Sequence, residues 1–234
     1  MAEGSHMEAE NTATLQDQAY ERLRQSIIFS TLKPGERLVA KDLCDELRMG
    51  RTPVREAIVR LQQDGLVRTV PQSGTFVAEI SLKAAECSRF MREHLEREVA
   101  VECCAKIRPE DAAFLERIIA LEEAAVRERN QRDFFTSDNL LHQAFFDIAG
   151  RRRVWEWLNA ASTDLERYRW LRVETEGLAW DTIMDQHYRL RDAILGHDPH
   201  EVDFLVALHL HMMFDDQARV ITEFPEYFAV GEEG

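Results

Sequence analysis

One carboxylate and three imidazoles stand at positions from which they could hold a metal ion. Asp138 and His142 are four residues apart in a stretch with helical apolar spacing, so they share one helix face. His187 and His209 lie in the next-to-last and last helical patterns of the chain. If these four side chains converge in an apolar bundle, they suit Zn²⁺ or Ni²⁺ and leave open positions for a small ligand. His211 is two residues from His209 and faces roughly the opposite way, so we do not expect it in the same site.

The residues alone leave other interpretations of these histidines open. A lone histidine in a helical bundle is more often a hydrogen-bonded core or surface residue than a ligand, and Asp-x3-His pairs are common on helices. A metal with an open position could also activate water in a hydrolase or isomerase. The H-E-x-x-H motif is absent, however, and no recognisable motif places a general base beside the cluster. We therefore expect a protein that is not an enzyme, and keep the metal-dependent hydrolase or isomerase as the alternative.

A second group of side chains, all arginines, could read DNA. Residues 48–68 contain five arginines against two acidic residues, a net charge of +3. Thr52 is the expected N-cap of a helix with Pro53 at its first position, so Arg51 and Arg55 lie at the N-terminal end of that helix. An arginine there can bind guanine O6 and N7 through two hydrogen bonds, and the free N–H groups of the helix start, with Thr52, can hold a phosphate.

The elements around these arginines predict a winged helix-turn-helix. Apolar spacing predicts helices over 14–29 and 41–47 and a third from residue 52 to about 64. Two β-rich runs, 66–70 and 75–77, flank a turn and predict a hairpin. Gly74 at its tip would allow close approach to a DNA backbone or minor groove, with donors from Gln72 and Ser73. In this architecture the third helix enters the major groove.

After residue 80 the pattern becomes entirely helical, which makes the fold class mainly α. Long apolar repeats punctuated by Pro and Gly predict an antiparallel six-helix bundle with helices near 82–106, 110–129, 131–149, 152–172, 178–196 and 199–222. We expect the linker near 79–82. The predicted domains are a DNA-binding head over 13–79 and a helical bundle over 80–226, to which the resemblance described below assigns effector binding and dimerisation, with a tag-like, disordered N-terminus over 1–12 and a tail over 227–234.

The charge is divided unevenly between these two predicted domains. The 234 residues carry a net charge of −14, which as a single figure argues against nucleic-acid binding. Residues 1–78 contribute only −1, so the acidity belongs to the bundle. An apolar content of 45% excludes intrinsic disorder, and no apolar run is long enough to span a bilayer. Four cysteines without a C-x-x-C pair, and no secretory signal, favour the reducing cytoplasm.

The head resembles the GntR family of bacterial transcription regulators. The resemblance is carried by L-K-P-G-E-R-L at 32–38, R-T-P-V-R-E-A-I-V-R-L at 51–61 and D-G-L-V at 64–67. It implies that Arg51 and Arg55 contact operator bases and that Thr52 and the turn over 72–74 support them. Lys41 stands where FadR-type members often have arginine, and it supplies charge to a phosphate without the bidentate fork.

The bundle is similar to the FCD ligand-sensing domain of FadR-type regulators. R-F-M-R-E-H-L-E at 89–96, the Asp-x3-His helix and H-Y-R-L-R-D-A-I-L-G-H-D at 187–198 carry this resemblance. It implies a divalent metal held by Asp138, His142, His187 and His209, and a small organic-acid effector whose carboxylate pairs with Arg92. Some relatives instead bind acyl thioesters without metal. Because one module reads few base pairs, we expect a homodimer on palindromic double-stranded operator DNA, acting as a repressor, with no membrane partner.

Overall fold

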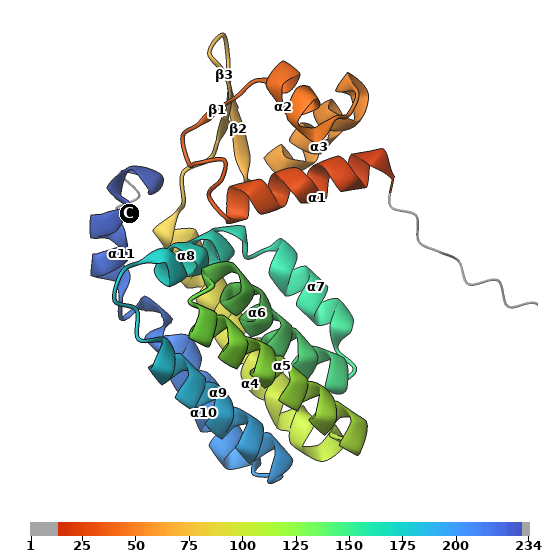
Figure 1. Ribbon diagram of the computed structural model, residues 1–234, viewed down its shortest axis with the longest axis vertical. Helices are drawn as coiled ribbons and strands as arrows, with labels where there is room; N and C mark the ends of the chain where they lie inside the picture. The colour runs from red at the N-terminus through yellow and green to blue at the C-terminus, as the bar shows by residue number, and fades with distance from the viewer. Residues whose placement is uncertain (1–13, 231–234) are drawn as a thin grey trace, which may run out of the picture.

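The computed structural model describes residues 14–230, and the tag-like segment predicted for the N-terminus lies outside this range. The chain forms a small upper lobe at its N-terminal end and a larger helical lobe below it (Figure 1). The mainly α fold class is therefore confirmed. No helix in the described part of the chain is long and apolar enough to cross a membrane.

The upper lobe contains three helices arranged as a helix-turn-helix. They are α1 (Leu15–Ile28), α2 (Ala40–Leu47) and α3 (Arg51–Gln63). Thr14 caps α1 through a reciprocal capping box with Asp17, as its sequence favours. The prediction of Thr52 as the N-cap of α3 is wrong, because the helix starts at Arg51 with Gly50 as the cap, two residues earlier than predicted. Thr52 is therefore a first-turn residue, and its backbone N–H still belongs to the free set at the helix start.

A three-stranded antiparallel sheet completes this lobe. The predicted hairpin is formed by β2 (Val67–Val70) and β3 (Gly74–Val77), with Val67 opposite Val77 and Val70 opposite Gly74. A third strand, β1 (Arg37–Leu38), pairs with β3 and was not predicted, because two residues carry no periodicity. The hairpin tip and the α2–α3 corner both lie at the end of the molecule away from the lower lobe (Figure 1).

The lower lobe is all α, as predicted, but has more breaks than expected. The predicted six helices become α4 (Leu82–Lys106), α5 (Pro109–Glu128), α6 (Gln131–Ile148), α7 (Arg152–Ala160), α8 (Thr163–Glu174), α9 (Trp180–Leu195), α10 (Pro199–His211) and α11 (Gln217–Glu223), with 3₁₀ turns at Met212–Phe214 and Pro225–Tyr227. The segment predicted as one helix over 152–172 divides at Ser162, whose hydroxyl donates to the Leu158 carbonyl and favours a bend. The last predicted helix divides after His211.

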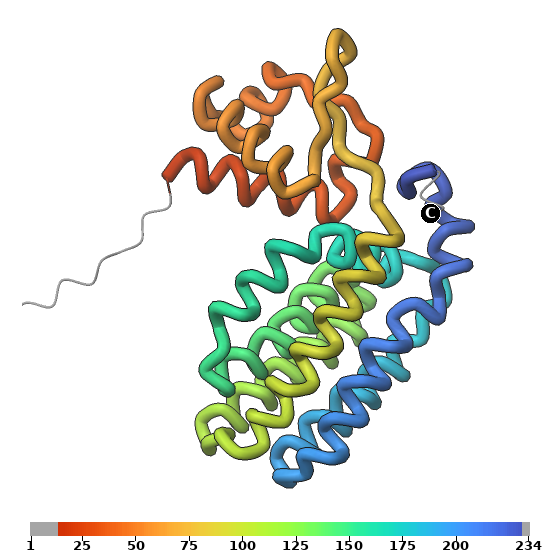
Figure 2. The backbone as a smooth tube through the Cα atoms, turned by 180° about the vertical axis from the view of Figure 1, so that it is seen from behind, coloured from red at the N-terminus to blue at the C-terminus, as the bar shows by residue number. Residues whose placement is uncertain are grey.

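Helix α4 runs through the bundle and contacts α6, α8, α9 and α10 (Figure 2). Its N-terminus is capped by Ser81, whose side chain accepts from the Ala84 N–H. The core around it is almost wholly apolar. A few polar and charged side chains are nevertheless buried in the bundle, and these build the site described below.

The linker between the lobes is fixed on both sides. Arg167 of α8 donates to the carbonyl of Ala78, and the carboxylate of Asp164 accepts from the Ser81 N–H. On the other side Ile80 pairs with the chain end in a short parallel bridge to Phe228. Tyr227 and Phe228, placed by the sequence in a tail, are thus buried residues of the junction. The blue chain end lies beside the yellow linker in Figure 2.

Candidate metal centre and nucleic-acid interface

The bundle brings the four predicted ligands together. Asp138 and His142 come from α6, His187 from α9 and His209 from α10, and all four are buried. One possible ligand atom from each lies within 4.8 Å of the other three. Two nitrogen or oxygen ligands on opposite sides of one ion are about 4 Å apart, so a small adjustment of side chains would fit all four to a single ion.

The three imidazole rings are held by hydrogen bonds at their outer nitrogens. Nδ1 of His142 bonds to the carboxylate of Glu96. Nδ1 of His187 lies 3.0 Å from Oε2 of Glu122, and Nδ1 of His209 lies 2.9 Å from Oε1 of Gln186. Since these oxygens accept, each Nδ1 carries the proton and each Nε2 keeps its lone pair. Carboxylates and amides in such positions orient metal-binding histidines and raise their basicity.

The inward-facing nitrogens are the atoms that make this cluster fit a metal. Nε2 of His142 and Nε2 of His187 are buried and have no hydrogen-bond partner within the described residues. An unpaired buried acceptor costs about 1–3 kcal/mol, so structures rarely leave two in one place. A divalent cation would satisfy both lone pairs together with the ring of His209 and the carboxylate of Asp138.

The carboxylate of Asp138 is ionised and oriented by an arginine. Burial alone would raise its pKa, but the guanidinium of Arg169 and the neighbouring rings outweigh burial and hold the pKa below its usual range. Arg169 bonds to Oδ2 of Asp138 and donates to Oδ1 of Asn139 at 2.6 Å. The other oxygen, Oδ1, lies 3.6 Å from Nε2 of His187. Asp138 can therefore face an ion with one oxygen while Arg169 holds the other.

The protonation of the rings suits metal binding. Burial lowers the pKa of His142, and burial together with the two neighbouring rings lowers that of His209 well below its ordinary value. Burial alone would also lower the pKa of His187, but the carboxylates of Glu122 and Asp138 outweigh it and raise it. Two rings are thus kept in the neutral form that a metal requires, and loading a metal displaces any proton from the third.

Replacing Glu122 by glutamine should weaken metal binding without removing a ligand. The amide keeps a hydrogen bond to His187 but removes the charge that strengthens the ring as a ligand, so we expect about 10- to 100-fold lower affinity. Competition with a coloured chelator measures this. Glu123→Gln is the matched control, because Glu123 is the exposed neighbour that binds the Tyr188 hydroxyl. Equal affinities for the two variants would contradict the role given to Glu122.

Sequence reasoning missed the outer partners of the cluster, which are Glu96, Glu122, Gln186 and Arg169. A signal existed for Glu122, because it continues the buried stripe of α5 formed by Leu115, Ile118 and Ala125. A charged residue on the apolar face of a helix needs a buried partner. Nothing in the sequence, however, says that this partner is His187 on a helix more than fifty residues away.

Arg92 is buried beside the cluster, as the family resemblance implies. It lies in α4 one turn before Glu96, and its Nε donates to Oε2 of that residue at 3.0 Å. Its guanidinium also lies over the ring of Trp155, 5.7 Å from the centroid. The Nη2 group is buried and lacks a partner within the described residues. Arg92 thus presents a fixed, unused donor.

The predicted DNA-contacting residues lie exposed on the upper lobe. Arg51, Thr52 and Arg55 occupy the first turns of α3, and Lys41 lies at the start of α2. Fewer arginines of the 48–68 segment are available to bind DNA than its net charge of +3 suggests, because two of them form ion pairs with acidic residues of the protein. They are Arg60, which is 2.7 Å from Asp17, and Arg68, which is 2.7 Å from Glu79.

The wing turn has a backbone that explains its glycine. Gln72 adopts φ +63° and Gly74 φ +132°, and Gln72 and Ser73 are exposed. A Cβ on Gly74 would lie 2.9 Å from Nε of Arg37, so the guanidinium of Arg37 lies against the turn at Gly74. Arg37 was not among the predicted residues, and it adds a positive charge at the wing.

Helix α8 contacts both the cluster of four candidate metal ligands and the upper lobe. Through Arg169 it holds Asp138, and three residues earlier Glu166 pairs with Arg24 of α1. Trp170 packs edge-on against Phe29, with ring centroids 4.8 Å apart. One rigid helix therefore connects the buried cluster to α1.

Comparison with known proteins gives the same division of the chain. Residues 15–77 match the family of bacterial regulatory proteins called the gntR family, and residues 89–212 match the FCD domain. An HTH-type transcriptional regulator in an unstable DNA locus of Streptomyces ambofaciens is 30% identical, with 94% of this chain and 92% of that protein aligned. The HTH-type transcriptional repressor RspR of Escherichia coli K12 is 25% identical, covering 93% of this chain and 95% of that one.

Solved structures share the fold. Escherichia coli McbR/YncC matches with a TM-score of 0.77 at 20% identity, over 90% of this chain and 99% of that one. A GntR transcriptional regulator from Rhodococcus sp. RHA1 matches with a TM-score of 0.70, also at 20% identity, over 88% of this chain and 97% of that one. With its helix-turn-helix head, its all-α lower lobe and these relatives, the chain belongs to the GntR family of transcriptional regulators and carries an FCD domain.

Proposed function

We propose that this regulator is a metal-dependent sensor of a small organic acid, and that it represses transcription as a homodimer on a palindromic operator. The buried, unpartnered Nε2 atoms of His142 and His187, aimed at Asp138 and His209, carry the metal part of the proposal. Zn²⁺ or Ni²⁺ suits three imidazoles and a carboxylate. When bound, the metal supplies a Lewis-acid site for a carboxylate oxygen.

Arg92 is the residue of the chain that recognises the acid. Its Nε is engaged by Glu96, which fixes the plane of the guanidinium, and its Nη2 is left to donate. A donor already fixed and desolvated loses little entropy when a carboxylate arrives. Charge-assisted bonds of this kind are among the stronger ones in proteins.

A homodimer is supported by the chemistry of DNA recognition and by the surface of the bundle. One helix-turn-helix reads too few base pairs to select a site in a genome, whereas two related heads read a palindrome. Helices α4, α7 and α10 expose large apolar side chains, namely Phe90, Leu95, Trp157 and Phe204. Covering these side chains with a second copy of the chain would remove apolar surface from water, which favours association. The repressor RspR among the relatives supports the direction of the regulation.

Helix α8 offers the route by which the acid would alter DNA binding. A ligand changes an equilibrium only when it binds one arrangement better than another. Arg169 contacts Asp138, and Glu166 and Trp170 contact α1, so a shift of α8 at the cluster would move the head.

The proposal is tested by titrating metal-loaded protein on an operator selected from random DNA. We expect at least one acid in a panel of small carboxylates to change operator affinity, and chelator treatment to abolish that response. Arg92→Met should retain the metal and lose the response. Arg191→Met, on α9 and paired with Glu116, is the control. A full response in Arg92→Met, or in metal-free protein, would refute the assigned site.

A further inference from the structure

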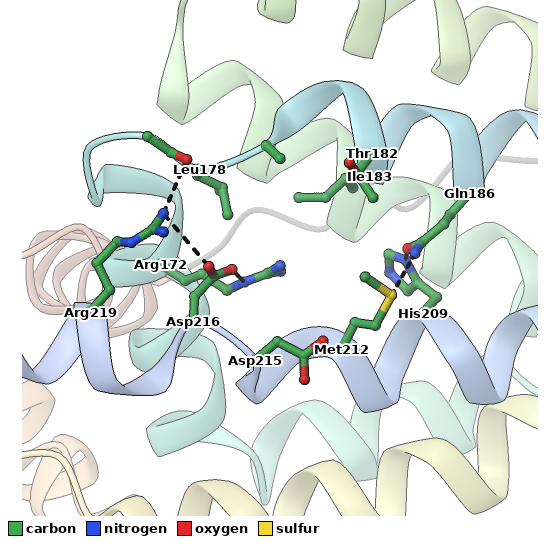
Figure 3. Close-up of a pocket in the computed structure, with 12 residues that line it drawn as sticks. Arg172, Leu178, Thr182, Ile183, Gln186, His209, Met212, Asp215, Asp216 and Arg219 are labelled. Carbon is green, nitrogen blue, oxygen red and sulfur yellow. Dashed lines mark hydrogen bonds and ion pairs between the residues drawn. The ribbon is translucent and has the colours of Figure 1, made fainter.

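A cavity of about 230 Å³ lies directly beside the metal cluster (Figure 3). His209, one of the four proposed ligands, forms part of its wall together with Gln186. Ligand cavities in proteins run from about 300 to 1,000 Å³, so this one is suited to a small molecule. Whatever binds there lies next to the metal site.

The end of the cavity near the cluster is polar and its middle is apolar. Gln186 uses its Oε1 to hold His209 and points its Nε2 at the sulfur of Met212, 2.9 Å away. Leu178 and Ile183 face the cavity from the loop before α9 and from α9 itself (Figure 3). A short carbon chain leaving the metal cluster would pack against these side chains.

The far end of the cavity presents an arginine whose position is fixed. Nε of Arg172 donates to Oδ2 of Asp216 at 3.0 Å, and Oδ1 of the same aspartate lies 3.8 Å from Arg219, which also donates to the Gly177 carbonyl. Of the three nitrogens of the Arg172 side chain, only Nε has a hydrogen-bond partner within the described residues. Figure 3 shows the end of this side chain pointing into the cavity. The side chain is only 16% exposed. Both Nη groups are therefore free to bind a carboxylate through two parallel hydrogen bonds.

We propose that this cavity binds the second carboxylate of a short dicarboxylic acid, with Arg172 as the residue that selects it. The inference rests on the proposed function, because the first carboxylate belongs to the proposed metal site, of which His209 lines this cavity. The acid lies with its carbon chain between Leu178 and Ile183, and its far carboxylate meets Arg172. The Asp216 carboxylate balances the arginine charge when the cavity is empty and orients the fork that the ligand uses.

The test uses the zinc-loaded full chain and two pairs of acids matched in length, butyrate with succinate and pentanoate with glutarate. Isothermal titration calorimetry gives the affinity of each. Charged hydrogen bonds of this kind correspond to about a 10- to 100-fold preference for the dicarboxylate. In Arg172→Met the ratio of dicarboxylate affinity to monocarboxylate affinity should fall to near one. The variant should keep its monocarboxylate affinity and its metal.

Controls separate this inference from the function on which it rests. Arg191→Met is the matched control, since Arg191 on α9 is equally shielded at 18% exposure but pairs with Glu116 outside the cavity. Arg172→Lys keeps the charge without the fork, so it should lose most of the preference and serves if the methionine variant does not fold. Equal binding of both members of each pair, or a preference retained in Arg172→Met, overturns the role of Arg172. If none of the four acids binds, the dicarboxylate inference fails; the proposed function fails only if no acid of the wider panel changes operator affinity.

Discussion

His209→Ala is expected to abolish stoichiometric metal binding and the thermal stabilisation that metal gives. The variant removes one of four proposed ligands, and its outer partner is the neutral amide of Gln186, so no buried charge loses its partner. By contrast, removing His187 would leave Glu122 buried and unpaired, and removing His142 would leave Glu96 with Arg92 as its remaining partner. This makes His209 the cleanest ligand to remove.

The size of the effect follows from linkage between binding and folding. A metal present at one hundred times its Kd stabilises the folded chain by about 2.7 kcal/mol. For a chain of this length that raises Tm by roughly 5–10 °C. Elemental analysis after gel filtration and thermal melts with and without chelator measure both quantities.

His211→Ala is the matched control for this prediction, because His211 lies two residues further along α10 and is exposed. It should bind metal and melt as the unmodified chain does. Metal retained at one equivalent per chain in His209→Ala would show that the cluster does not hold the ion.

Arg51→Ala is expected to remove sequence-specific DNA binding while leaving non-specific binding largely in place. A bidentate arginine–guanine contact contributes about 1–3 kcal/mol of discrimination. A dimer on a palindrome makes it twice, so the loss is about 2–6 kcal/mol, or roughly 30-fold to 10⁴-fold in affinity. Because Arg51 is exposed, stability should change by no more than about 0.5 kcal/mol.

Fluorescence anisotropy on the selected operator and on scrambled DNA, at one fixed salt concentration, measures this loss. Arg60→Ala is the control on the same helix, since Arg60 pairs with Asp17 inside the lobe. A loss that is equal on both DNAs would assign Arg51 to a phosphate and not to a base.

Local features of the fold could be predicted from the sequence because their causes are local. The shared face of Asp138 and His142 follows from the helical repeat, and Thr14 and Ser81 act as caps where the sequence favours them. The break at Ser162 could not be predicted, because neither proline nor glycine marks it. The N-cap of α3 was misplaced by two residues, because Thr52 is a better cap than Gly50 by side chain alone.

The site depends on contacts between residues that are far apart in the sequence, and for this reason less of it could be predicted. Its four ligands were named through family resemblance, and the bundle then brings three helices together around them. The residues that hold the rings, such as Glu122 and Gln186, are paired across 65 and 23 positions of the chain. No periodicity encodes such a pairing. Arg172 was passed over for the same reason, since only the fold brings Asp216 and the cavity to it.

The pairing of Ile80 with the segment around Phe228 has a consequence for synthesis of the chain. The two partners are separated by nearly the whole bundle, and chains grow at about 5–20 residues per second. The head can therefore fold about 7–30 s before this bridge can form. Until then the linker is held from one side, by the contacts of Ala78 and Ser81 with α8, so Tyr227 and Phe228 complete the junction last.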